Sequence, residues 1–316
     1  MADARPRSRS PLMAMILSLL LCASIATPVA GRVLPDAPAP TSSREDDPPS
    51  ETPEKLAAWP APADAKALDK DVARLRKANT EEMGLQAVAA LKEAGAAAAP
   101  ALLEALAKER KEDAQQRILH VLTAVTEAPH TRLLAAEFAA KSGDVRVFAL
   151  RRVANFPDPG VREAAAAAWA SVVAQGEKAD PLEAYAAALC LSSSGSSEAL
   201  APLIAAADKD WKDRGEEIRT ATEPLRGDPA ALALLAPDLA PEADRAKKVA
   251  ALRILAGVGD LATAKRYVKP LLGENDNSIR VAAINACRGI VDGQLPIDKI
   301  SVFEAVEAAK EWQQKL

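Results

Sequence analysis

Residues 246–293 read AKKVAALRILAGVGDLATAKRYVKPLLGENDNSIRVAAINACRGIVDG, and this stretch holds one sequence unit followed by the start of its own copy. The run KVAAL at 248–252 returns as RVAAI at 280–284, and GV at 257–258 returns as GI at 289–290. The offset between the copies is thirty-two residues. Self-similarity at such a period indicates an array of stacked helical units.

Each unit is expected to hold two antiparallel helices. Apolar residues recur about one turn apart in the first helix, as from Val281 to Cys287, and Gly257 and Gly289 are interpreted as the signals that end these helices. The second helix is expected over residues 262–272. Neither helix can bury its apolar stripe alone, so the pattern predicts an all-α protein, an α-solenoid of stacked antiparallel helix pairs.

A short motif precedes several first helices. Residues Asp276 to Arg280 read DNSIR, residues Asp158 to Arg162 read DPGVR, and a shortened form, GDVR, ends at Arg146. An aspartate directly before a helix accepts hydrogen bonds from unpaired amides and is favoured at the positive end of the helix dipole.

In this motif the chain resembles HEAT repeats, and more narrowly the short HEAT-like repeats first associated with phycobilisome lyases. The resemblance implies that the motif arginine is structural and packs along the stack, at Arg280 and Arg146 in this sequence. The lyase activity of some relatives is not expected here, because no residues mark a chromophore site.

Aligning the first helices on position 248 predicts about seven units between residues 65 and 316. The first helices are then expected near seven positions: Ala87, Arg117, Arg146, Glu183, Glu217, Lys248 and Arg280. The phase is ambiguous at residues 158–173, which resemble a first helix but fall in the place of a second, and in the proline-rich stretch 217–241. Ser301 and Glu304 form a capping box before a last helix that is expected to close the stack.

Two segments precede the expected repeat domain at 65–316. Residues 1–26 resemble an export signal, with three arginines, an apolar run and small residues before the cleavage point. Residues 27–64 are rich in proline and acidic residues, which predicts a disordered tether whose Trp59 docks onto the first helix. The mature protein is therefore expected to be periplasmic or secreted, and membrane-bound only if the signal is not cleaved.

The sequence predicts no catalytic, cofactor or metal site. His120 and His130 have no partner residues at ligand or catalytic spacing, and Cys190 and Cys287 lie in small-residue contexts typical of buried thiols. The formal net charge of −4 argues against a nucleic-acid partner, which would call for a basic surface. We expect a monomer.

A surface for an unidentified protein partner is the most plausible product of such a fold. Second helices often line the concave side of a stack, so the expected contact residues are Trp211, Lys265, Arg266 and Lys269. This predicts a non-catalytic scaffold or adaptor that mediates protein–protein interaction. The alternatives are a lyase-like enzyme or cofactor-maturation factor on the same fold, and an envelope-anchored assembly factor.

Overall fold

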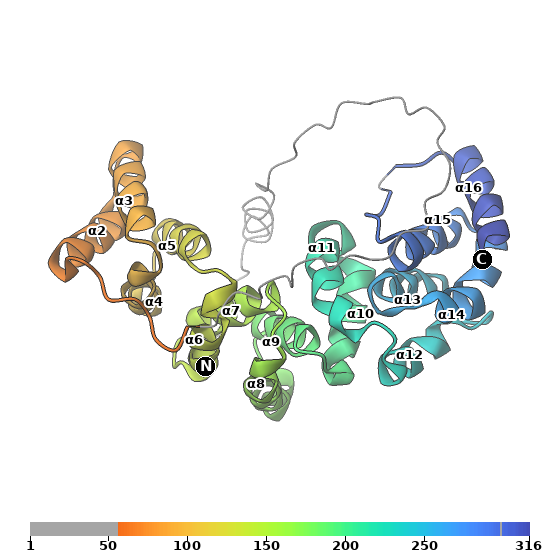
Figure 1. Cartoon of the computed structure of the whole chain (residues 1–316), viewed down its shortest axis with the longest axis horizontal. Helices are drawn as coiled ribbons and strands as arrows, with labels where there is room; N and C mark the ends of the chain where they lie inside the picture. Colours follow the sequence, from red (N-terminus) through yellow and green to blue (C-terminus); the bar gives the residue numbers. More distant parts are fainter. Residues whose placement is uncertain (1–55, 298) are drawn as a thin grey trace, which may run out of the picture. The chain divides into compact units, whose positions relative to one another are not determined.

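The computed structural model describes residues 56–297 and 299–316, and every regular element within these residues is a helix (Figure 1). The proposed export signal and residues 27–55 of the proposed tether lie outside the described residues. The α-helices are α2 Ala65–Lys77, α3 Glu81–Ala94, α4 Ala99–Lys108, α5 Glu112–Val125, α6 Thr131–Ala135, α7 Gly143–Ala154, α8 Arg162–Gln175, α9 Pro181–Ser193, α10 Leu200–Lys209, α11 Trp211–Thr222, α12 Pro229–Leu235, α13 Arg245–Val258, α14 Leu261–Thr263, α15 Asn277–Cys287 and α16 Val302–Lys315.

Short 3₁₀ or π turns extend or join these helices. They are η1 Gly95–Ala98, η2 Ala128–His130, η3 Ala136–Ala139, η4 Pro159–Val161, η5 Gly176–Lys178, η6 Ser197–Ala199, η7 Glu223–Leu225, η8 Ala236–Leu239, η9 Ala264–Val268, η10 Lys269–Gly273 and η11 Arg288–Asp292. The second helix expected over 262–272 is thus built from three short pieces, α14, η9 and η10. Leu261, the first residue of α14, is exposed.

The helices alternate along the chain as the thirty-two-residue pattern predicts. The seven positions expected in first helices lie in α3, α5, α7, α9, α11, α13 and α15. The ambiguous segment at 158–173 forms α8, which takes the place of a second helix. Helix α2, which packs on α3 and α5, is an additional helix before the first of these units.

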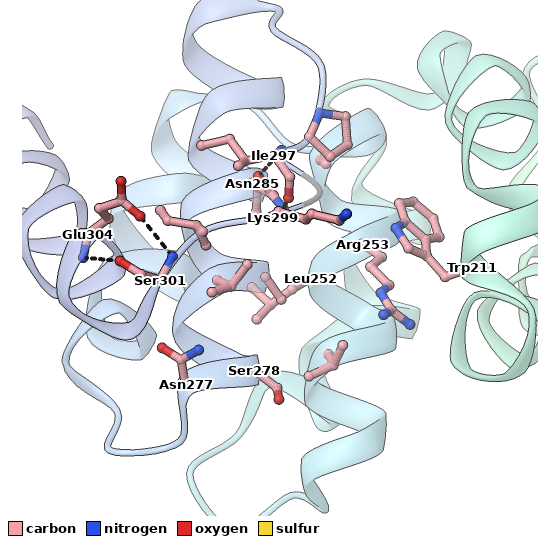
Figure 2. Close-up of a pocket in the computed structure, with 17 residues that line it drawn as sticks. Trp211, Leu252, Arg253, Asn277, Ser278, Asn285, Ile297, Lys299, Ser301 and Glu304 are labelled. Atoms are coloured by element: carbon pink, nitrogen blue, oxygen red, sulfur yellow. Dashed lines mark hydrogen bonds between the residues drawn. The ribbon is translucent and has the colours of Figure 1, made fainter.

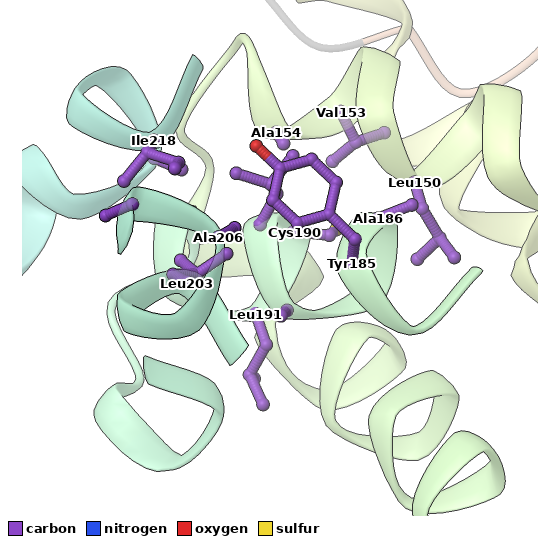
Figure 3. Packing of buried hydrophobic residues seen from close by; sticks show 14 of the residues in the cluster. Leu150, Val153, Ala154, Tyr185, Ala186, Cys190, Leu191, Leu203, Ala206 and Ile218 are labelled. Atoms are coloured by element: carbon purple, nitrogen blue, oxygen red, sulfur yellow. The ribbon is translucent and has the colours of Figure 1, made fainter. Parts of the chain in front are cut away.

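Most first helices pack directly on the first helix of the next unit, except that α7 packs on α4 rather than on α5. Helix α7 contacts α9, α9 contacts α11, and α13 contacts α15. Figure 3 shows Leu150, Val153 and Ala154 of α7 meeting Ala186 and Cys190 of α9 in one apolar layer. Burial of this layer supplies the main force that holds neighbouring units together.

Gly257 and Gly289 do not end the first helices, so that interpretation was wrong. Gly257 lies inside α13 and Gly289 inside η11, and neither has a positive φ. A Cβ atom at Gly257 would lie 2.5 Å from Oγ1 of Thr222, and one at Gly289 would lie 2.8 Å from the carbonyl oxygen of Ala256. Both glycines therefore let a first helix approach the preceding one closely. The chain after Gly289 turns at Gly293, where φ is 63°.

Aspartates cap the helices at two of the three motif sites; in the shortened motif Asp144 lies inside the first turn of α7, and Ser142 at the cap position makes no side-chain hydrogen bond. The Asp276 side chain accepts hydrogen bonds from the backbone N–H groups of Ser278 and Ile279 at the start of α15. Asp158 accepts one from the N–H of Gly160, and its other oxygen accepts the Thr131 hydroxyl. The capping box expected at Ser301 and Glu304 is present at the start of α16.

The motif cations bind the main chain that leads into their own helix. Arg146 donates to the carbonyl oxygen of Ala140 (2.7 Å), Arg280 to that of Glu274 (2.6 Å) and Lys248 to that of Pro241 (2.6 Å): in each case the acceptor lies six or seven residues upstream. Arg162 is the exception. It is exposed at the start of α8 and forms no hydrogen bond or ion pair with any residue that the structure describes.

Two of these cations also pair with a carboxylate farther along the chain. Arg146 forms a bidentate pair with Glu183 of α9, with both N–O distances at 2.6 Å. Lys248 lies 3.3 Å from a carboxylate oxygen of Glu274, at the end of the second helix of its own unit. The first pair therefore orients one unit on the next, and the second pair holds the two helices of one unit together.

A buried polar cluster joins three successive first helices. Arg151 of α7 donates two hydrogen bonds to Glu217 of α11, at 2.8 and 3.0 Å. The Tyr185 hydroxyl of α9 donates to the same carboxylate (3.3 Å), and the Arg214 guanidinium lies 4.2 Å from the Tyr185 ring. Burial, and then the Glu217 charge, raise the pKa of Tyr185 far above its ordinary value, so this hydroxyl stays a donor.

Residues 56–60 do not dock as expected. The Trp59 ring stacks on His130 of η2 with ring centroids 5.5 Å apart, and the Leu56 N–H donates to the Pro129 carbonyl. The segment is therefore fixed beside the start of α6, and its docking on the first helix was wrong. Trp59 thus contacts His130, which lies far from it in the sequence, and the residues around Trp59 carry no signal that predicts this partner.

Candidate functional site

A cavity of about 800 Å³ lies on the faces of α13 and α15 (Figure 2). We call it the groove. Helix α11 contributes Trp211 at one end, α16 contributes Glu304 at the other, and the segment between α15 and α16, with Ile297 and Lys299, lies between these ends. Its lining residues are Trp211, Val249, Leu252, Arg253, Ala256, Asn277, Ser278, Val281, Ala282, Asn285, Ala286, Pro296, Ile297, Lys299, Ile300, Ser301 and Glu304.

The groove repeats from unit to unit. Val249 and Arg253 of α13 correspond to Val281 and Asn285 of α15 at the thirty-two-residue offset. The same helix face therefore presents an aliphatic residue followed, one turn later, by a polar side chain in both units. Small residues between them, such as Ala282, leave the backbone of the helices close to the cavity.

Asn285 recognises an extended piece of backbone. Its side-chain nitrogen donates to the Ile297 carbonyl oxygen (3.2 Å), and its side-chain oxygen accepts the Ile297 N–H (2.8 Å). The side-chain amide of Asn285 thus pairs with both the backbone N–H and the backbone C=O of Ile297 (Figure 2). This arrangement copies the pairing between neighbouring β-strands and does not depend on the side chain that is bound.

Two cations and an indole meet at the other end of the groove. The Arg253 guanidinium lies 5.3 Å from the Trp211 ring, and one of its nitrogens donates to the Ala207 carbonyl oxygen at 2.6 Å. Figure 2 shows the Lys299 side chain extending toward the same indole. Lys299 has no hydrogen-bond partner or ion pair among the described residues. Burial lowers the pKa of Arg253, and the Asp208 carboxylate opposes that shift.

The structure separates the four residues that the sequence analysis grouped as partner contacts. Trp211 was expected to end a second helix, but α10 ends at Lys209 and Trp211 begins α11, a first helix. Lys265, Arg266 and Lys269 lie in η9 and η10 and do not line the groove. Lys265 and Arg266 are exposed, and the Arg266 guanidinium lies 4.9 Å from the Tyr267 ring.

The groove is formed by first helices, whereas the sequence analysis placed the partner surface on second helices. Sequence reasoning missed Arg253, Asn285 and Lys299. A usable signal existed for the first two, since polar side chains recur at the thirty-two-residue offset inside first helices that are otherwise small and apolar. No signal marked Lys299, because it reaches the groove from an irregular segment.

The residues screened for chemistry occupy structural positions. The Lys92 amino group lies 3.0 Å from Nε2 of His120, and Nδ1 of His130 accepts the Glu127 N–H at 2.9 Å. Cys190 and Cys287 are buried and free, and burial raises the pKa of the Cys287 thiol to about 12. Within residues 56–297 and 299–316, no three His, Cys, Asp or Glu residues are placed to hold a metal ion. No helix in that part of the chain has the length and apolarity that a bilayer span requires.

Comparison with known proteins adds no relative: no family model, curated protein or solved structure matches this chain significantly. The resemblance to HEAT-like repeats therefore rests on the motif residues alone.

Proposed function

We propose that this protein is an exported α-solenoid scaffold of about seven HEAT-like units that binds a segment of a protein partner in the groove, without catalytic activity of its own. The alternation of first and second helices and the contacts between successive first helices support the solenoid. The pair Arg146–Glu183 supports a regular stack, because it ties one unit to the next.

The observation that carries the binding proposal is the pairing of Asn285 with Ile297. A first-helix side chain here holds a non-helical segment by both of its backbone groups. Main-chain pairing of this kind provides affinity for an extended polypeptide, while neighbouring side-chain contacts provide specificity. The groove continues from this point over α13 to Trp211.

Export rests on residues 1–26. The envelope-anchored assembly factor differs from the exported scaffold only in keeping this segment. Fractionation of the source cells distinguishes them: an exported scaffold is recovered without its first residues in the periplasmic or culture fraction, and an anchored factor is recovered at full length with the membranes.

The binding proposal is tested by site-specific photo-crosslinking in the source organism. A benzophenone amino acid replaces Val281, which lines the groove, or Leu261, an exposed aliphatic residue of α14 that does not line it. Polypeptide adducts at position 281 and none at position 261 support the proposal. Adducts at 261 with none at 281 contradict it.

A further inference from the structure

We propose that the groove selects an acidic partner segment: an extended polypeptide whose carboxylate binds between Arg253 and Lys299, beside Trp211. The inference rests on the proposed function and adds the chemistry of the partner.

The bound position of Ile297 shows how much of the groove remains open. Asn285 and Ile297 occupy the part that lies over α15. Packed helices lie about 8–10 Å apart, which an extended chain spans in about three residues. A partner segment of that length covers α13, from the edge of the Ile297 segment to Trp211.

The open part of the groove carries two cations that form no ion pair with any described residue. Arg253 uses one nitrogen on the Ala207 carbonyl, and its remaining donors have no acceptor among the described residues. Lys299 faces the same space and has no ion-pair partner in that part of the chain. Among the described lining residues Glu304 is the acidic one, and its side chain is committed to the backbone N–H of Ser301 in the capping box.

A carboxylate is the group that this corner fits best. Charge-assisted hydrogen bonds to arginine are about twice as strong as neutral ones, and the planar guanidinium binds the two carboxylate oxygens together. Arg253 is already oriented by the Trp211 ring and the Ala207 carbonyl, so little conformational entropy is lost on binding.

The two ends of the groove differ, which gives the bound segment a direction. Trp211 supplies a half-buried aromatic surface at the cationic end, the kind of residue that contributes strongly to protein interfaces. The opposite border belongs to α16, where Glu304, Glu307 and Glu311 line a second hollow together with the exposed Phe303. Lys299 lies between the two hollows and lines both. The carboxylate therefore belongs at the Trp211 end, and apolar residues belong beside α16.

The test pans a phage-displayed library of random twelve-residue peptides against the full chain. We expect selected peptides to be enriched in Asp and Glu, and a synthetic selected peptide to lose at least tenfold in affinity when its acidic residue is replaced by the matching amide. Lys299→Glu, a change at an exposed residue, should abolish the acidic enrichment. Lys265→Glu, which makes the same charge change outside the groove, should leave it intact.

The possible failures are distinct. Selected peptides that are neutral or basic, and that no longer bind when groove residues are changed, would overturn the acidic selectivity and leave the proposed function standing. An absence of both binders and crosslinks at position 281 would defeat both proposals. Concentration-dependent dimerisation of the full chain that Lys299→Glu removes would replace the partner protein with a second copy of this chain.

Discussion

Replacing Glu217 with alanine should destabilise the packing of α7, α9 and α11 more than any change at a neighbouring charged residue. The Glu217 side chain is 8% exposed and receives two hydrogen bonds from Arg151 and one from Tyr185. Truncation leaves the Arg151 guanidinium without its counter-ion and the Tyr185 hydroxyl without its acceptor, both in positions that water reaches poorly.

The expected cost follows from that burial. Removing one member of a buried ion pair costs about 3–5 kcal/mol, because the other charge stays desolvated. The Arg151 side chain is 22% exposed, so some water reaches it and the lower end of this range applies. We therefore expect Glu217→Ala to lower the free energy of unfolding by about 3 kcal/mol.

The measurement is a double-mutant cycle by urea unfolding, followed by circular dichroism, with Arg151→Ala, Glu217→Ala and the double variant. The double variant should be more stable than the sum of the single effects predicts, by about 2 kcal/mol, since it leaves no unpaired charge. Hydrogen exchange should show the loss of protection in α7, α9 and α11, because contacts in a repeat array are local. Glu216→Ala, on the exposed side of the same helix, serves as the control.

Additive single effects, within about 0.5 kcal/mol, would refute the reasoning, because independent sites add to that accuracy. A cost below about 1 kcal/mol for Glu217→Ala would do the same, since exposed ion pairs contribute no more than that.

Three further predictions concern other parts of the chain. Burial lowers the pKa of His130 from its ordinary value of 6.5. The free energy of unfolding should therefore be constant above pH 6.5 and fall as the pH drops toward the folded-state pKa, because the unfolded chain takes up the proton first and protonation opposes the hydrogen bond from the Glu127 N–H. Urea midpoints measured from pH 7.5 to 5 check this. Gly289→Ala should cost about 1–3 kcal/mol in urea unfolding, because the new methyl group meets the Ala256 carbonyl oxygen. Ile284→Asp buries an unpaired charge in α15, and hydrogen exchange should show the C-terminal units losing protection before the N-terminal ones.

Each of these has its own control and contrary outcome. The pH dependence between 7.5 and 5 should flatten in His130→Gln, and an unchanged slope in that variant would assign the effect to other groups. Gly143→Ala introduces only an ordinary contact at 3.7 Å from the Arg146 side chain, so equal losses at Gly143 and Gly289 would show that helix packing is not the cause. Uniform loss of protection along the whole chain in Ile284→Asp would show that the stack unfolds as one unit.

The sequence predicted the features that depend on neighbours in the chain. The all-helical fold, the alternation of first and second helices, the aspartate caps and the Ser301–Glu304 capping box all follow from local periodicity and from hydrogen bonds over a few residues. The burial of Cys190 and Cys287 followed from the small residues that surround each of them in the sequence.

Features that join distant positions were decided only by the tertiary structure. Glycines at 257 and 289 were interpreted as helix ends, yet they are contact points, because what surrounds a glycine is set by the helix packed against it. Trp59 found its partner at His130, and Trp211 moved from the end of one helix to the start of the next, where it meets Arg253.

The groove shows the same division. A repeat fixes which residues occupy equivalent helix positions, so the sequence by itself placed Arg253 and Asn285 at the same position of successive first helices. Which face of the stack becomes hollow depends on how closely successive helices approach, and that distance is set by side chains from different units. The irregular segment that carries Ile297 and Lys299 has no period at all, and only packing against α15 brings it to the groove.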